Sequence, residues 1–533
     1  MAQWKHGSGT PSSQSMGTLH DGDVRSRSVP TCSILSRRSS PGALSVTTAY
    51  SATRQAIPAL AGLLPCHNKH EGGSTMDMDL VIRGGEIVNA DGRFSADIGI
   101  RGEKIVQIGG EMRGPEIDAR GRTVLPGAID AHVHLTMPQV PEDGVAWADD
   151  FTSGSEAALA GGITTIGNMT FLLPDESMFA GLEREAALAR VEAIADVILH
   201  PVIGDPRQAI IDEIPEIVAA GHSDIKFFMS TPTFDRNATG YLKATAEAGK
   251  NGALTLIHCE DYPIIEQSIE RLLAEGRESL RNYPESRPII SEVVATQRAV
   301  AFAEYTGAPV YIVHLSSRRA MEVCQEAQAR GAPVYVETRP LYLHLTSERF
   351  LEDDGAKYVG QPPLREPEDV EALWAAVANG SLHTICTDHA PWKLVHKLDP
   401  ALHVGNLRPG MENLQTMLPM LYSLGVRTGK ITLERMVQAT ATNVAKLFGL
   451  YPRKGTIAVG SDADIVIWDL KETRTIRDED VLSRAGHSIY NGWEITGWPI
   501  TTLRRGQVVY DNRRIVAKPG SGKLLPRGLT QAL

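Results

Sequence analysis

The stretch TVLPGAIDAHVHL, residues 123–135, is apolar for most of its length and ends in two histidines. Seven further apolar runs of strand length follow it along the chain. They lie at 163–169, 197–203, 224–229, 254–258, 310–314, 333–338 and 383–387. Segments rich in Ala, Glu and Arg, such as 183–195 and 292–305, separate most of these runs and are predicted to be helical. Eight alternations of strand and helix predict an α/β protein with a parallel (β/α)₈, TIM-like barrel.

Shorter strand-like runs lie on both sides of the predicted barrel. On the N-terminal side they fall at 80–82, 86–88, 97–100 and 104–106, and on the C-terminal side at 464–468 and 506–510. The pairs Gly84-Gly85, Asp91-Gly92 and Gly102-Glu103 are typical of turns and predict antiparallel pairing. We therefore expect one small β-sandwich domain formed from both chain ends.

These patterns divide the chain into five segments. We expect an N-terminal extension at 1–75, the sandwich at 76–124 and 451–515, the barrel at 125–450, and a C-terminal tail at 516–533.

The N-terminal extension differs in composition from the rest. It is rich in Ser, Thr, Gly and Arg, has only Asp21, Asp23 and Glu71 as acids, and shows no sustained apolar periodicity. We predict that it is disordered. Two origins remain open: a transit peptide, or an upstream start codon with Met76 or Met78 as the working start. We favour the second.

Overall composition excludes several classes of protein. The chain has 533 residues, 42% of them hydrophobic and 22% charged, so a sizeable core is expected. The net charge of −11 argues against a nucleic-acid or anionic-membrane partner. No apolar run approaches the roughly 20 residues of a membrane span. The five cysteines are scattered without a C-x-x-C pair, which argues against a disulfide framework or zinc knuckle and favours a cytoplasmic location.

Two histidines end the first barrel strand. Because side chains alternate along a strand, His132 and His134 point to the same side and can share a metal ion. A single H-x-H pair is weak evidence on its own. However, Lys226, His258, His314 and Asp388 also lie in or at the ends of predicted strands. Barrel active sites are built from the C-terminal ends of different strands, so these six residues together favour a metal centre over isolated core histidines.

Lys226 needs a separate explanation, because a cation repels a metal pair. A lysine inside an apolar strand has a lowered pKa and is a good nucleophile. Reaction with CO₂ would convert it into a carbamate, an anion whose two oxygens can bridge two cations.

Ten short motifs support a family assignment. They are PGAIDAHVHL (126–135), MP (137–138), DDF (149–151), GGITT (161–165), ET (337–338), QPPLR (361–365), TDHAP (387–391), KG (454–455), GSDAD (460–464) and YNGWE (490–494). In these motifs the chain resembles the amidohydrolase superfamily, and within it the hydantoinase and dihydropyrimidinase group. The resemblance covers about residues 78–515.

The resemblance implies a role for each ligand-type residue. One cation would be held by His132, His134 and Asp388, and the other by His258 and His314, with carbamylated Lys226 as the bridge. The cations would be Zn²⁺. A hydroxide between them would attack the amide carbonyl, and Asp388 would carry its proton to the leaving nitrogen. By the same analogy we expect a homotetramer.

The predicted substrate-binding residues are Asn406, Thr338, Arg339 and Thr231, and two of them depart from the family pattern. Thr231 replaces a tyrosine that helps to hold the oxyanion in hydantoinases. Arg339 replaces a small residue, and would either bind a substrate carboxylate or pair with a protein acid such as Glu337. The sequence leaves these alternatives open.

The leading functional hypothesis is hydrolysis of a cyclic amide: a hydantoin, a dihydropyrimidine, or a related ureide or imide. An allantoinase, or another amidohydrolase with an anionic substrate, is the alternative that Arg339 suggests. Dihydroorotases carry an arginine soon after H-x-H, where this chain has Leu135-Thr136-Met137, which argues against that branch. A non-catalytic structural relative is a third hypothesis, and the six ligand-type residues argue against it.

Overall fold

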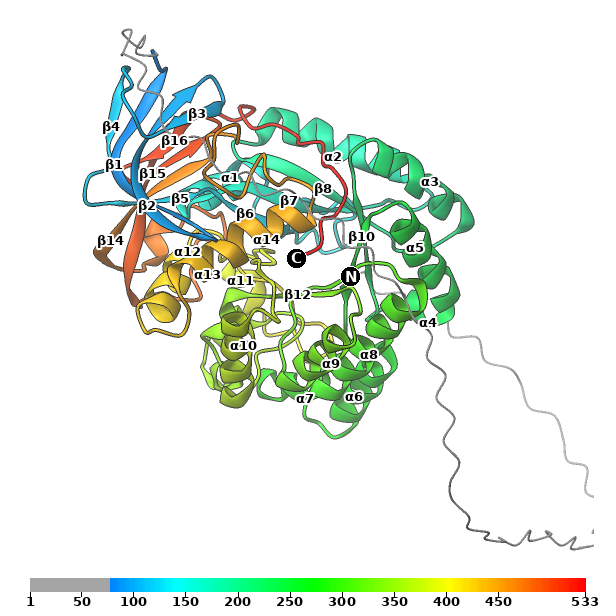
Figure 1. Ribbon diagram of the computed structural model, residues 1–533. Coiled ribbons are helices and arrows are strands. Elements are labelled where there is room, and N and C mark those ends of the chain that lie inside the picture. The colour runs from blue at the N-terminus through cyan, green and yellow to red at the C-terminus, as the bar shows by residue number, and fades with distance from the viewer. Residues whose placement is uncertain (1–76) are drawn as a thin grey trace, which may run out of the picture. The chain divides into compact units, whose positions relative to one another are not determined.

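The computed structural model of the protein describes residues 77–533, which form an eight-stranded barrel and a second sheet of nine strands (Figure 1). The barrel strands are β6 (Ala128–Val133), β7 (Ile163–Phe171), β8 (Asp196–Val202), β9 (Asp224–Phe228), β10 (Leu254–His258), β11 (Val310–Ile312), β12 (Val334–Thr338) and β13 (Thr384–Ile385). Each strand pairs in parallel with the next in chain order. A parallel bridge between Val133 and His389 brings the two edges together and nearly closes the barrel. The predicted (β/α)₈ barrel is confirmed.

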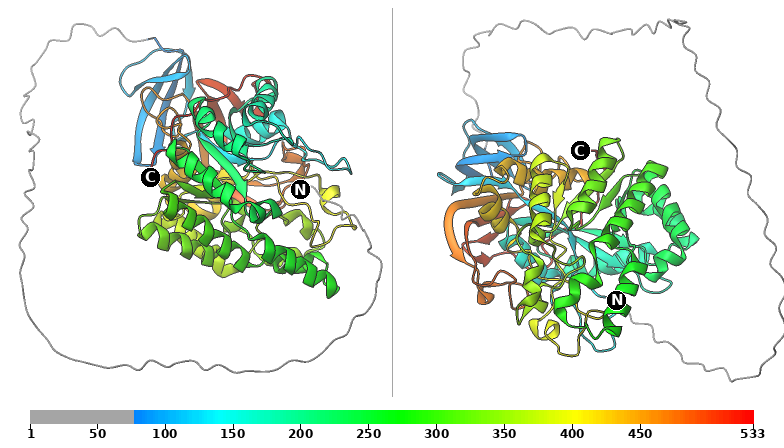
Figure 2. Two further views of the ribbon diagram at one scale, coloured as in Figure 1. Left: turned by 90° about the vertical axis from the view of Figure 1, so that its right-hand side faces the viewer. Right: turned by 90° about the horizontal axis from the view of Figure 1, so that it is seen from below.

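Helices connect the strands and surround the barrel (Figure 2). They are α1 (Phe151–Ala160), α2 (Met178–Glu192), α3 (Gln208–Ala219), α4 (Pro232–Arg236), α5 (Ala238–Lys250), α6 (Tyr262–Ala274), α7 (Tyr283–Ser286), α8 (Ile289–Thr306), α9 (Arg318–Ala329), α10 (Pro367–Asn379), α11 (Leu394–Lys397), α12 (Met417–Leu421), α13 (Leu433–Val437) and α14 (Asn443–Leu447). Short helical turns are η1 (Leu280–Asn282), η2 (Pro340–Leu343), η3 (Ser347–Leu351), η4 (Gly355–Tyr358), η5 (Tyr422–Val426), η6 (Gln438–Thr442) and η7 (Asp478–Asp480).

The second sheet combines strands from both ends of the described chain, which lie side by side in Figure 1. Its strands are β1 (Leu80–Asn89), β2 (Gly92–Arg101), β3 (Lys104–Ile108), β4 (Glu116–Asp118), β5 (Thr123–Pro126), β14 (Ile465–Thr475), β15 (Glu494–Arg504), β16 (Gln507–Asp511) and β17 (Arg514–Ile515). The hydrogen-bonded order is β17-β16-β15-β14-β5-β1-β2-β3, with β4 beside β1. One apolar cluster, which includes Ile87, Ile98, Ile465 and Leu503, joins the two end segments. The predicted contribution of both chain ends is therefore confirmed.

Two local predictions were wrong. Gly84-Gly85 is not a turn, because β1 runs through it as one strand with a shift of register against β2 between Ile82 and Gly85. Gly84 has φ +68°, a left-handed conformation that suits glycine at such a bulge. The stretch 123–135 is also not one strand. It divides at Gly127 into β5, which belongs to the second sheet, and β6, the first strand of the barrel.

The last residues of the chain pack against the end of the barrel where the strands begin, which we call the barrel floor. Val197 at the start of β8 exchanges backbone hydrogen bonds with Lys523 and Leu525, at 2.8 and 2.9 Å. The buried Arg527 forms an ion pair with Asp224 at the start of β9, and Asp224 also lies 2.7 Å from His200. This segment therefore completes the barrel floor with both backbone and charged contacts.

The predicted disorder of residues 1–75, and its two alternative origins, lie outside the described residues. Within 77–533, no helix has the length and apolar character needed to cross a membrane.

Candidate metal centre

Three of the predicted ligands meet where the first and last barrel strands end. The Nε2 atoms of His132 and His134 lie 3.2 and 2.9 Å from Asp388 Oδ1. The two imidazole rings are 5.4 Å apart between centroids, as expected for side chains two residues apart on one side of a strand. All three side chains are buried or nearly so, which keeps bulk water from competing for their ligand atoms.

The other two predicted histidines form an adjoining pair. His258 Nδ1 lies 2.9 Å from His314 Nε2, and the His314 ring is 5.5 Å from the His132 ring. One ligand atom each from His132, His314 and Asp388 can be chosen so that all three lie within 4.8 Å of one another. The structure thus brings all five histidine and aspartate side chains into one cluster.

Lys226 extends from β9 between these residues and has no hydrogen-bond partner among the described residues. Its side chain is fully buried, and Nζ lies 4.9 Å from the centre of the Phe228 ring. Burial lowers the pKa of the Lys226 amine to about 8. A neutral amine is therefore accessible near neutral pH, which is the form that reacts with CO₂.

His134 and His314 are held in the unprotonated form that binds metals. Burial lowers the pKa of His134 to about 4 and the pKa of His314 well below its ordinary value, and the nearby Lys226 charge lowers both further. Burial alone would raise the pKa of the Asp388 carboxyl, but Arg339 and His132 outweigh it and hold that pKa well below its usual range. The cluster thus offers imidazole nitrogens and a carboxylate, a donor set that fits Zn²⁺ and similar cations.

Two of the ligand-type residues have strained backbones. His314 has φ +40° and Asp388 has φ +50°, in the left-handed region that residues other than glycine rarely adopt. Such strain persists only where surrounding contacts maintain it, and it concentrates at functional sites. Both residues lie just past their strands, where a change of backbone direction turns the side chain toward the cluster.

Glutamates behind the histidines fix the orientation of the rings. His132 Nδ1 lies 2.8 Å from Glu337 Oε1, and this leaves Nε2 facing Asp388. His258 Nε2 lies 2.8 Å from Glu260 Oε2, and this leaves Nδ1 facing His314. Carboxylates in this position behind a histidine are common at metal sites. Sequence reasoning missed Glu260, although its place two residues after a candidate ligand was an available signal.

Arg287 holds Glu260 in turn. Arg287 Nε donates to both Glu260 oxygens at 3.0 and 3.2 Å, and Nη2 donates to Oε2 at 2.6 Å. Arg287 precedes helix α8, and no spacing rule in the sequence connects it to the histidines.

Arg339 pairs with a protein acid, one of the two alternatives left open by the sequence, but that acid is Asp388 and not Glu337. The Glu337 oxygens already face His132, the Tyr311 hydroxyl and the His314 backbone N–H. Arg339 instead donates from Nε to the Thr387 carbonyl at 3.1 Å, and its Nη1 lies 3.3 Å from Asp388 Oδ2.

The other three predicted substrate-binding residues make only local side-chain bonds. The Thr338 hydroxyl donates to the Leu315 carbonyl at 2.8 Å. Thr231 caps the start of α4, where its hydroxyl accepts the Phe234 N–H at 3.4 Å. Asn406 Oδ1 accepts the His403 N–H at 2.6 Å. None of these bonds reaches the histidine cluster, so their substrate roles remain predictions.

Aromatic side chains line one side of the cluster and were missed by the sequence analysis. The Trp147 ring lies 5.1 Å from the His134 ring and 6.3 Å from that of Trp392. Phe171 lies 5.8 Å from His134 and stacks at 6.1 Å on Phe228. We call Trp147, Phe171, Phe228 and Trp392 the aromatic wall. Isolated aromatic residues at the ends of strands and in loops carry no signal that distinguishes a pocket from a core.

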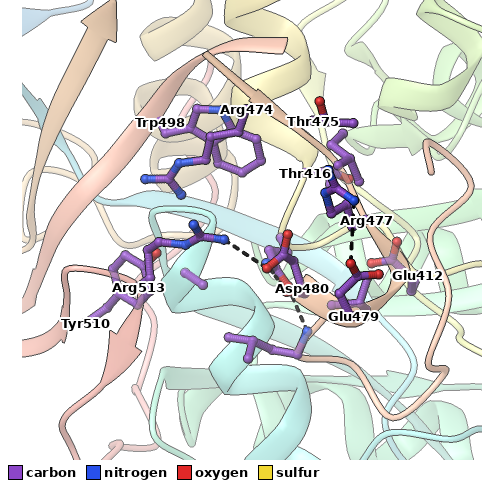
Figure 3. A pocket seen from close by; sticks show the side chains of 15 residues that line it. Glu412, Thr416, Arg474, Thr475, Arg477, Glu479, Asp480, Trp498, Tyr510 and Arg513 are labelled. Atoms are coloured by element: carbon purple, nitrogen blue, oxygen red, sulfur yellow. Dashed lines mark hydrogen bonds and ion pairs between the residues drawn. The ribbon is translucent and has the colours of Figure 1, made fainter. Parts of the chain in front are cut away.

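A separate cavity of about 240 Å³ lies between β14, β15 and the segment around η7 (Figure 3). Its lining includes Arg474 and Trp498, and Arg513 pairs with Asp480 at 2.9 Å. No predicted site residue lines it. Arg477 and Glu479 form a second ion pair in its lining at 3.7 Å, whereas the buried Glu412 side chain has no hydrogen-bond partner among the described residues.

Known proteins resemble this chain over most of its length. Residues 123–509 match the family model described as the amidohydrolase family. A D-hydantoinase of Ralstonia pickettii is 36% identical over 459 residues, 84% of this chain and 99% of the relative. A D-phenylhydantoinase of Escherichia coli K12 is 34% identical over 461 residues, 84% of this chain and 98% of the relative. The crystal structure of dihydropyrimidinase from Brevibacillus agri matches with a TM-score of 0.81 at 35% identity, and covers 84% of this chain and 99% of that one. As its motifs predicted, the chain belongs to the amidohydrolase family, in the hydantoinase and dihydropyrimidinase branch, and is a hydrolase.

Proposed function

We propose that the protein hydrolyses a cyclic amide, such as a hydantoin, a dihydropyrimidine, or a related ureide or imide, with the help of two divalent cations. The observation that carries this proposal is the convergence of four histidines, one aspartate and one unpartnered lysine on a single buried cluster. The names of the relatives, hydantoinase and dihydropyrimidinase, support the substrate class.

The cluster residues would divide between two Zn²⁺ ions. His132, His134 and Asp388 would hold one ion, and His258 and His314 the other. The Lys226 amine, buried and without a partner, would form a carbamate with CO₂ and bridge the two. When bound, the cations supply an acidified water as nucleophile and polarise the amide carbonyl.

Asp388 would move the proton that the reaction requires. One of its oxygens faces the histidines and the other faces Arg339, so the carboxylate lies between the ligand cluster and Arg339. From there it would accept a proton from the nucleophilic water and deliver it to the ring nitrogen. An amide nitrogen leaves poorly until it is protonated, so this transfer permits ring opening.

The remaining predicted residues would shape the substrate pocket. We propose that the ring lies against Thr338, Asn406 and Arg339, with its substituent toward the aromatic wall. Thr231 would lie close to the developing oxyanion. Its short side chain makes it a weaker donor than a tyrosine, so we expect slow turnover of unsubstituted hydantoin.

We further propose that the enzyme acts as a homotetramer in the cytoplasm. Its ligand would be a small molecule, with neither nucleic acid nor membrane as a partner, in keeping with the net charge of −11.

Two measurements on the purified full chain test the proposal. Elemental analysis should find about two divalent cations per chain. A hydrolysis screen over hydantoins, dihydrouracil, allantoin and cyclic imides should show turnover of at least one of them. Protein that holds no metal after metal-sparing preparation would refute the mechanism. A metal-loaded protein that opens none of these rings would refute the substrate class.

A further inference from the structure

Arg339 is a buried arginine with few partners for its charge. It follows β12, and its side chain is completely buried. Within residues 77–533, its side chain makes one hydrogen bond to the protein, from Nε to the Thr387 carbonyl. Neither Nη1 nor Nη2 has a hydrogen-bond partner there. Buried donors of a charged group are costly to leave without acceptors.

Two neighbouring buried arginines, Arg287 and Arg365, make more hydrogen bonds than Arg339 does. Arg287 makes three hydrogen bonds to Glu260. Arg365 donates from Nε to the Ser316 hydroxyl at 3.0 Å and from Nη1 to the Arg287 carbonyl at 2.8 Å. Arg365 Nη2 also lacks a hydrogen-bond partner within residues 77–533, but of these three arginines only Arg339 lacks one at both terminal nitrogens.

Of the nearby acids, Asp388 compensates the charge of Arg339 only in part and Glu337 makes no ion pair with it. Glu337 is engaged by His132, Tyr311 and the His314 backbone. Asp388 is the nearest acid, 3.3 Å from Nη1, but its other oxygen faces His132 and His134. In the function proposed above, Asp388 also holds a cation, so its charge is not available to Arg339 alone.

The guanidinium is fixed in place rather than mobile. A Cβ atom at Gly360 would lie 2.7 Å from Arg339 Nη1, so the absence of a side chain at Gly360 makes room for the guanidinium. Its other side is 5.5 Å from the centre of the Tyr342 ring. A fixed guanidinium with two free terminal nitrogens is suited to an oxygen anion, above all to the two oxygens of a carboxylate.

We propose that Arg339 selects substrates that carry an anionic group, so that the enzyme acts on cyclic amides bearing a carboxylate close to the amide served by Asp388. The inference rests on the proposed function, because it names a substrate class for that same site. Arg339 would donate from its terminal nitrogens to the carboxylate oxygens, and no bond of Arg339 changes during the reaction.

One experiment compares two substrates of nearly equal shape and different charge. We expect the metal-loaded enzyme to hydrolyse hydantoin-5-acetate with a kcat/KM at least about tenfold above that for hydantoin-5-acetamide. Arg339→Met should reduce that ratio by about tenfold or more, mainly through KM. Arg339→Lys should keep part of it, because charge is retained without the planar guanidinium. Arg474→Met, in the separate cavity, is the control and should leave the ratio unchanged.

A binding measurement separates this inference from the proposed function. Cyclopentaneacetate and cyclopentaneacetamide have no ring amide to open, so calorimetry reports their affinity without turnover. We expect tighter binding of the acetate, and loss of that preference in Arg339→Met and part of it in Arg339→Lys. If no ring is hydrolysed but the preference depends on Arg339, the proposed function fails and the anion site stands. If the wild type shows no preference, or the variants keep it, the inference is wrong even where hydantoins are hydrolysed.

Discussion

Both ends of the barrel bury ionisable side chains, but the two ends differ in how far those side chains are paired within residues 77–533. At the barrel floor, Asp224 contacts Arg527 and His200, and Lys454 contacts Asp196 and two further aspartates. We call the opposite end, where the strands lead into the histidine cluster, the barrel top. There the Lys226 amine and both Arg339 terminal nitrogens have no hydrogen-bond partner among residues 77–533.

The difference shows how burial can serve two purposes in one fold. Paired charges at the floor fix how the chain ends meet the barrel, because removal of one member leaves the other buried and uncompensated. At the top, the Lys226 amine and the terminal nitrogens of Arg339 lack hydrogen-bond partners within residues 77–533, so a bound ion or ligand would stabilise them. Buried charge alone is therefore a poor guide to function, and buried charge without a partner is a better one.

The largest expected effect follows from removal of a ligand at the barrel top. His132→Ala and Asp388→Ala should each lower kcat/KM by at least about 10³-fold, because the cation and the proton carrier are lost. Circular dichroism and the thermal midpoint should change little, since the barrel core is formed by other residues. Either variant retaining more than a tenth of wild-type turnover would contradict the proposed roles.

A change at the barrel floor should have the reverse signature. Arg527→Met leaves Asp224 buried without its cation and should lower the free energy of unfolding by about 3–5 kcal/mol. Chemical denaturation measures this loss, while kcat per folded molecule should stay near the wild-type value. The double variant Asp224→Leu/Arg527→Met should recover much of the stability, because no single charge remains buried. If Arg527→Met changed kcat and not stability, the comparison between floor and top would be wrong.

Low pH should destabilise the barrel floor by removing the charge of Asp224 from its ion pair with Arg527. Burial would raise the pKa of Asp224, but Arg527 and His200 outweigh it and hold that pKa well below its usual range. The ion pair therefore stabilises the fold above the unfolded pKa of about 3.9, and this contribution is lost as pH falls below it. Arg527→Met should show a smaller loss of stability between pH 6 and pH 3 than the wild type.

Lys226 tests whether the unpartnered amine becomes a bridge. Lys226→Ala should lower kcat by about 10²-fold or more, and short carboxylic acids such as acetate should restore part of it by replacing the carbamate. Mass spectrometry under native conditions should find the mass of one CO₂ on the wild type and not on the variant. Lys226→Arg with full activity and both metals would refute the bridge, since a guanidinium does not form this carbamate.

The smallest expected effect is at Thr231. Loss of its helix cap in Thr231→Ala should lower stability by about 1 kcal/mol, and Thr231→Ser should restore it. If the hydroxyl also contacts substrate, kcat/KM should fall in the alanine variant and recover in the serine variant. A normal kcat/KM in Thr231→Ala would limit this residue to the cap of α4.

Strands bounded by clear turn signals could be predicted from the sequence. The run at 254–258 corresponds to β10 without change, with the turn residues Asn251-Gly252 shortly before it and the acids Glu260-Asp261 shortly after it. The run at 383–387 was predicted too long. β13 has only Thr384–Ile385, since the residues that follow turn aside to place Asp388, which has a left-handed backbone. Local pattern does not reveal where a functional residue ends a strand early.

The candidate site also contains some residues that could be predicted from the sequence and others that could not. Ligand-type residues at strand ends were visible because alternation and barrel topology specify where such side chains meet. Glu260 and Arg287 hold His258 through contacts between residues far apart in sequence, and no periodicity encodes them. The sequence left open whether Arg339 binds a substrate carboxylate or pairs with a protein acid. Which acid lies near Arg339 is a property of the folded chain.

Gly127 has a consequence for how this protein can be taken apart. It is the single residue between β5 of the second sheet and β6 of the barrel, and its N–H donates to the Asp464 carbonyl at 2.9 Å. A Cβ atom there would lie 2.3 Å from the Thr164 hydroxyl oxygen. At this junction no linker exists in which to cut, lengthen or exchange one sheet without disturbing the strand that leads to His132 and His134. Protein engineering and natural recombination therefore have to keep the two sheets together as one unit.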